Sequence, residues 1–174
     1  MTVGSGKLLE EVRARLLQTF DANAPPDSDL PFPTEYRGAY KVRRFECAMR
    51  LYDAVGVGRG DRPASARQSH ENFRLFGAPH LAMLTTEADL GVYGAVDVGG
   101  YLQVLMLAMQ AHGVATIAQA ALATQSTLLK EMLSIPRART VVCGLSFGYE
   151  DTAHRANAFR TARAALSDVL DWRD

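Results

Sequence analysis

One segment, Gly99–His112, constrains the fold of this chain more than any other because it is apolar almost all round. Its polar side chains are Gln103, Gln110 and His112. A helix without a polar face is stable only when it is covered on most sides. We therefore predict a central buried helix here, covered within one chain or across a dimer interface. The longest apolar part, Tyr101–Ala111, is too short to cross a bilayer.

Composition limits the classes of protein that this chain can be. Its 174 residues suit one domain over 1–174, and the 48% hydrophobic and 22% charged fractions are those of a globular protein. Lys plus Arg is 19 and Asp plus Glu is 19, so we expect neither a nucleic-acid partner nor a membrane surface. Cys47 and Cys143 are isolated thiols, and Glu10 and Glu11 interrupt any secretory signal. These features predict a cytoplasmic protein.

Hydrophobic periodicity predicts an α+β fold in which helices surround a small sheet. The expected helices lie at 6–21, through Val42–Tyr52, at 62–75, at 99–112 and at 124–133, and the expected strands at 81–85 and 140–147. Gly56 and Gly58 supply the stop signal of the second helix. The proline-rich stretch 21–33 forbids a helix or a central strand and is interpreted as a surface excursion.

The sequence Gly144-Leu-Ser146-Phe-Gly148 matches the GxSxG pattern of serine hydrolases. Such a nucleophile needs later strands and a histidine downstream, and His154 follows after only eight residues. A strand that ends in small residues is therefore the favoured interpretation, with a serine hydrolase kept as an alternative. The four histidines show no metal-ligand spacing, so no metal site is expected.

Two segments could hold an anionic, flat ligand. Arg160 and Arg163 are three residues apart, so both can face one side of a helical turn and offer two guanidinium forks to a phosphate. The small residues of Gly113–Gln119 would let a backbone approach a flat ring closely. The alternatives are solvated arginines and a simple helix–loop–helix connection.

Five segments in order resemble one family. They are residues 71–80, 93–103, 113–119, 142–149 and 157–163. In this order and spacing they resemble the flavin-dependent nitroreductase family, in particular its nitrobenzoate-reductase-like branch. The resemblance implies an α+β homodimer around the central helix Gly99–His112. It also implies an FMN cofactor that passes hydride from NADH or NADPH to a small-molecule acceptor such as a nitroaromatic or a quinone.

The same resemblance assigns roles to particular residues. Ile117, Ala118 and Gln119 would lie beside the isoalloxazine with backbone N–H groups near its N5 atom, and Ala118 stands where the family usually has proline. Arg163 and Arg160 would meet the FMN phosphate. No catalytic side chain is expected, because the flavin carries the chemistry.

The start of the chain departs from the family pattern. The usual first helix and its Arg-x-Ser-x-Arg-like motif for the FMN phosphate are missing, and residues 1–6 align with the end of the strand that precedes the next helix. We therefore expect a shortened domain with half of the phosphate cage and a sheet strand lost. The alternative functions are a flavin-free partner or scaffold subunit, and an incomplete form of a longer enzyme.

Overall fold

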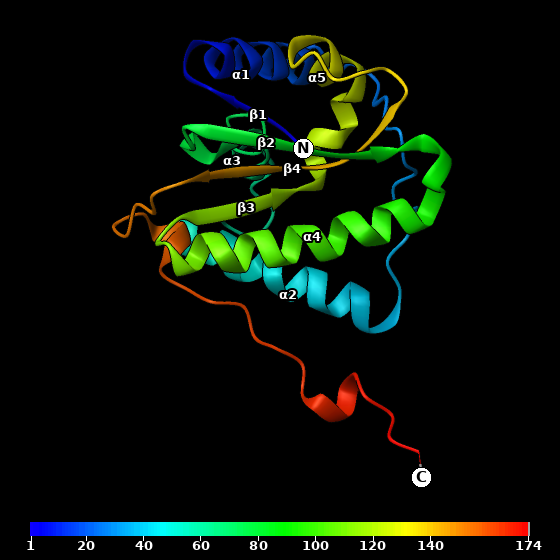
Figure 1. Ribbon diagram of the computed structural model, residues 1–174. Coiled ribbons are helices and arrows are strands. Elements are labelled where there is room, and N and C mark those ends of the chain that lie inside the picture. The colour runs from blue at the N-terminus through cyan, green and yellow to red at the C-terminus, as the bar shows by residue number, and fades with distance from the viewer. Residues whose placement is uncertain (174) are drawn as a thin grey trace. The chain divides into compact units, whose positions relative to one another are not determined.

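The computed structural model describes residues 1–173, which form two compact units (Figure 1). The first unit comprises Met1–Thr34 and Arg62–Glu150. The second joins Glu35–Asp61 to the chain from Asp151 onward. That 1–174 is a single domain stays a prediction.

An antiparallel sheet lies at the centre of the first unit. Its strands, in spatial order, are β1 (Thr2–Ser5), β2 (His80–Glu87), β4 (Arg139–Gly148) and β3 (Ala115–Gln119). The two strands predicted from the sequence are confirmed and are longer than expected. The strand β1 does form, so the chain keeps more of the sheet than the resemblance implied. The alternative of a simple helix–loop–helix connection at 113–119 is wrong, because five of these residues pair with β4 as a strand.

Two helices, α1 (Gly6–Asp21) and α5 (Ser126–Met132), cover one face of this sheet (Figure 1). The four-residue spacing of Leu8, Val12, Leu16 and Phe20 predicted the inner face of α1 in part: Val12 and Leu16 are completely buried, but Leu8 is 39% exposed and Leu9 takes its place in the core. The buried side chains pack with side chains from the sheet, from α5 and from the residues after it. The core residues that define this face are Leu9, Val12, Leu16, Leu81, Met83, Leu122, Leu129, Leu133 and Val141.

Helix α4 (Gly91–Ala111) lies on the other face of the sheet (Figure 1). Its inner side chains pack on four buried residues of β2 and β4, namely Ala82, Leu84, Cys143 and Leu145. Gly94 allows the close approach at the start of the helix, because a Cβ there would collide with Thr86. The helix is confirmed, although it starts eight residues earlier than predicted. Its burial on most sides is wrong for a single chain, because Gly94 is its only fully buried residue.

The connection between α3 (Arg62–His70) and β2 is a strained loop. Helix α3 is shorter than the predicted 62–75, and Leu75, Phe76 and Gly77 follow with consecutive positive φ angles of 58°, 51° and 75°. Such angles are unfavourable for side chains other than glycine. The loop holds them because Leu75 is completely buried in the core.

The second unit contains α2 (Gly38–Val55), whose residues are all at least partly exposed. The helix ends as predicted at Gly56, which takes a left-handed φ of 76° that glycine adopts without strain. After Asp151 the chain makes a short 3-10 turn at Arg155–Asn157 and a second at Leu166–Asp168. The rest of this segment, as far as it is described, has no regular secondary structure.

Candidate functional site

The strand β3 forms a free edge of the sheet, because it pairs with β4 on one side and with no other described strand. An edge strand presents a row of unpaired backbone N–H and C=O groups. Ile117 is 41% exposed and Ala118 is also exposed, so ligands can reach this edge from solvent. The segment predicted to face a flat ring therefore offers backbone N–H donors at an edge that ligands can reach.

Gln119 differs from its two neighbours because its side chain points into the protein. The residue is only 2% exposed, and its Nε2 donates a hydrogen bond of 2.8 Å to the backbone carbonyl of Asn72. Its Oε1 accepts a hydrogen bond from the hydroxyl of Ser146. A contribution of Gln119 to ligand binding would therefore come from its backbone.

Ser146 does not have the geometry of a hydrolase nucleophile. The residue lies inside β4, opposite Leu81 on one side and Ile117 on the other, and is 1% exposed. A nucleophile elbow requires an exposed serine on a sharp turn between a strand and a helix. The structural interpretation of the GxSxG match is thus confirmed, and the hydrolase alternative is wrong.

The loop that carries Asn72 is fastened to helix α1 by Arg13. The guanidinium Nε of Arg13 donates to the carbonyl of Arg74 at 3.0 Å, and Nη2 donates to the carbonyl of Ala78 at 2.9 Å. Glu10 holds the same guanidinium through Nη1. Two carbonyls of the strained loop are thereby satisfied by one rigid cation.

Arg160 and Arg163 belong to the second unit and do not share a helical turn. Between them the chain is irregular, so the predicted helix is wrong there. Arg160 donates through Nη1 to the carbonyls of Asn157 and Phe159 at 2.7 and 2.9 Å. Arg163 donates through Nη1 to the hydroxyl of Thr161 at 2.8 Å. Both side chains are exposed, and their contact with a phosphate stays a prediction.

The outer side of α4 is an apolar surface. It carries exposed Val92, Tyr93, Val96, Tyr101, Val104 and Leu107. Together with the preceding turn the helix spans Ala88–Ala111, which by length and composition alone is sufficient to cross a bilayer. The prediction from the sequence rested on uninterrupted apolar residues, of which Tyr101–Ala111 is the longest run, and the longer helix includes Asp89 and Asp97. A helix covered by another protein passes the same test, so this finding alone does not indicate a membrane.

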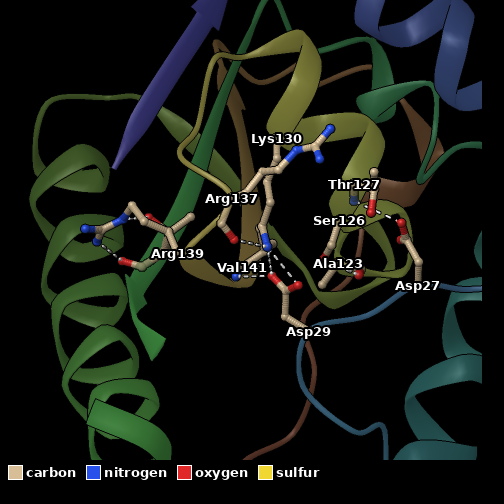
Figure 2. A network of polar contacts seen from close by, with 10 residues as sticks. Asp27, Asp29, Ala123, Ser126, Thr127, Lys130, Arg137, Arg139 and Val141 are labelled. Atoms are coloured by element: carbon tan, nitrogen blue, oxygen red, sulfur yellow. Dashed lines mark hydrogen bonds and ion pairs between the residues drawn. The ribbon is translucent and has the colours of Figure 1, made fainter. Parts of the chain in front are cut away.

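Polar contacts with α5 and with the first residues of β4 fix the proline-rich stretch 21–33 (Figure 2). The ammonium of Lys130 lies 2.8 Å from the carboxylate of Asp29, which also accepts the backbone N–H of Val141 at 2.6 Å. Asp27 accepts the backbone N–H of Thr127 in the first turn of α5. We call Asp27, Asp29, Lys130 and these backbone partners the aspartate clasp. Sequence reasoning missed the clasp because its members are about a hundred residues apart.

Two further observations bear on the chemistry of the first unit. Burial raises the pKa of the Cys143 thiol, so this group is a poor nucleophile at neutral pH. Among residues 1–173, no three His, Cys, Asp or Glu side chains converge as metal ligands. What the described residues offer here is the exposed edge of β3, with the buried hydrogen bonds of Gln119 behind it.

Comparison with known proteins gives the family. A model of the nitroreductase family matches residues 1–149. The nitroreductase NfnB of Mycolicibacterium smegmatis is 35% identical over 157 residues, which are 90% of this chain and 67% of that protein. A 4-nitrobenzoate reductase of Pseudomonas putida is 32% identical over 82% of this chain and 62% of its own length. The chain thus spans about two thirds of the length of these relatives.

A solved structure agrees with the sequence relatives. The crystal structure of the FMN-dependent NfnB from Mycobacterium smegmatis in complex with NADPH superposes with a TM-score of 0.93 at 32% identity. The superposition covers 99% of this chain and 77% of that one. The resemblance of the five sequence segments is confirmed: the chain belongs to the nitroreductase family and has its fold.

Proposed function

We propose that this chain forms an FMN-dependent oxidoreductase that passes hydride from NADH or NADPH to a nitroaromatic, quinone or similar small acceptor. The observation that carries the proposal is the likeness to NfnB over 99% of the chain. The free edge of β3, with its accessible backbone N–H donors, supports it. Bound FMN would supply the hydride-transfer chemistry.

The residues of β3 fit one part of this cofactor. A planar ring can lie against the accessible edge, where the outward N–H groups, which come from alternate residues within 117–119, would donate hydrogen bonds to its nitrogen and oxygen atoms. Ile117 adds an exposed apolar side chain beside the ring. The role of this chain at the ring is to bind and orient it.

For the FMN phosphate we propose Arg163, with Arg160 as a second ligand. Arginine presents a planar fork that matches a phosphate in charge and geometry. Arg163 uses only Nη1 in its contacts among the described residues. Its Nη2 and Nε therefore remain as donors for an anion.

The proposed partner is a second copy of the chain, bound through the Gly99–His112 part of α4. This helix exposes Tyr101, Val104 and Leu107 side by side at helical spacing. Contiguous apolar surface of this kind is typical of protein interfaces. A cytoplasmic location is part of the proposal, because Cys47 and Cys143 are both free thiols.

One experiment tests the activity and the assembly together. The purified 174-residue chain is titrated with FMN while visible absorption is recorded, and its mass is measured by light scattering after size exclusion. We expect a yellow dimer that NADH or NADPH bleaches and a nitroaromatic reoxidises. A colourless protein that ignores FMN would overturn the proposal and favour the flavin-free partner or the incomplete form. Co-sedimentation with anionic lipid vesicles would instead assign the outer side of α4 to a membrane.

A further inference from the structure

Three segments of the first unit meet through one buried chain of hydrogen bonds. The hydroxyl of Ser146 in β4 bonds to Oε1 of Gln119, and Nε2 of Gln119 bonds to the carbonyl of Asn72 at 2.8 Å. We call Ser146, Gln119 and Asn72 the buried relay. Ser146 and Gln119 are almost completely buried, so water cannot replace either partner.

The far end of the relay is itself fixed. The carbonyl of Asn72 also accepts the backbone N–H of Leu75 at 3.2 Å, which starts the positive-φ stretch of the strained loop. Arg13 fastens the same loop to α1 at Arg74 and Ala78. The relay therefore ties the edge strand β3 to a part of the chain that has little freedom to move.

The relay acts at the end of β3 that lies nearest to the proposed ring contact. Side chains alternate along a strand, so Ile117 and Gln119 share a face of the sheet, and Ser146 lies directly opposite Ile117 on that face. Five residues of β3 pair with β4, and the other edge has no ladder to hold it. Successive N–H groups of a strand point to opposite sides, so only one of Ile117 and Ala118 turns its N–H away from β4. The direction of that outward N–H group thus depends on how Gln119 is anchored.

We propose that Gln119 and Ser146 are positioning residues, which set the outward N–H groups of β3 for the flavin ring without touching it. The inference rests on the proposed function, since it concerns the same cofactor. It gives the serine of the GxSxG match and the side chain of Gln119 a role that is distinct from both catalysis and direct binding.

The decisive variant is Gln119→Glu, which keeps an oxygen for Ser146 and replaces the donor to Asn72 with a second oxygen. Below the pKa of the new carboxyl, its O–H again donates to the Asn72 carbonyl, and burial raises that pKa. We expect the FMN dissociation constant, relative to wild type at the same pH, to rise about tenfold near pH 8 and to recover near pH 5. A residue with only a packing role would not produce a pH-dependent ratio.

The variant Ser146→Ala tests the other bond, and Ser126→Ala is its matched control. Ser126 is also completely buried, but its hydroxyl donates to the carbonyl of Ala123 away from β3. We expect Ser146→Ala, and not the control, to weaken FMN binding and to speed hydrogen exchange of the 115–119 amides in the unbound protein. Melting temperatures of the unbound variants report whether each one folds.

The outcomes separate the two proposals. If the wild-type chain binds no FMN, the proposed function falls and this inference falls with it. If the wild type binds FMN and the Gln119→Glu and Ser146→Ala variants match it in affinity at every pH, only the positioning role is overturned. An equal loss of affinity in Ser126→Ala would also overturn it.

Discussion

On one face of the sheet, α1 and α5 enclose Leu9, Val12 and Leu16 completely, whereas on the other face α4 turns Tyr93 and Val104 outward. Tyr93 is 79% exposed and Val104 is 67% exposed. Both faces belong to the same sheet and both are covered by helices (Figure 1). The apolar side chains of the first face are buried within one chain, so we call it the complete face. The second face, which we call the incomplete face, leaves the apolar side chains on the outer side of α4 exposed. The difference puts the complete core on one face of the unit and the proposed contact with a second copy on the opposite face.

The largest effect is expected at the complete face. Leu16→Ala removes a fully buried side chain and should lower the free energy of unfolding by about 3–5 kcal/mol. Urea denaturation measures the loss, and Leu8→Ala on the exposed side of the same helix serves as the control. A loss as small as that of the control would show that this face is not the main core.

The next effect is expected at the incomplete face. Val104→Asp places a charge on the outer side of α4 and should weaken self-association at least about a hundredfold, which corresponds to roughly 3 kcal/mol. The free energy of unfolding measured on the monomer should stay near that of wild type. Light scattering gives the mass, and Gln103→Asp on the same helix is the polar control. A variant that remains dimeric would exclude this side of α4 as the interface.

A smaller loss is expected at the aspartate clasp, which lies at the edge of the complete face. Asp29→Ala leaves the nearly buried ammonium of Lys130 and the N–H of Val141 without their shared acceptor. We expect unfolding to become easier by about 2 kcal/mol, because the pair retains some contact with water. Asp27→Ala removes one exposed hydrogen bond and should cost less. Equal losses in the two variants would contradict the importance of the ion pair.

The elements that the sequence predicted well are those whose pattern is local. Helix 6–21 shows its inner face in apolar residues three or four apart, Leu9, Val12 and Leu16, and Gly56 marks the end of α2 by its backbone freedom. The strand at 115–119 was missed because its five residues become a strand only through pairing with β4, some thirty residues away. Spacing alone placed Arg160 and Arg163 on a helix, but this exposed segment has no packing that would hold a helix together.

For the candidate site, the family resemblance pointed to the segment that forms β3. It did not predict which contacts the side chains of this segment make. Gln119 was assigned to the cofactor through its backbone, which stays a prediction, and the structure shows its side chain in the buried relay. The relay joins residues 27 and 47 positions apart, and no local spacing encodes it. One signal was available, because Ser146 is a hydroxyl between the apolar residues Leu145 and Phe147 of the strand. A buried hydroxyl needs a partner, and this alone predicts a second polar side chain inside the protein.

The smallest effect concerns Cys143, which lies beneath α4 and so reports on how tightly the second face is closed. Because its pKa is raised in the folded state, its protonated form stabilises the fold below the ordinary value of 9.0, and this contribution is lost as the pH rises above it. We expect the urea midpoint to fall between about pH 8 and pH 10, and to fall less in Cys143→Ala. In native protein at neutral pH, iodoacetamide should modify exposed Cys47 and spare Cys143, as mass spectrometry can show. If Cys143 reacted as fast as Cys47, α4 would be loosely held. The two faces would then differ in their dynamics as well as in the exposure of their apolar side chains.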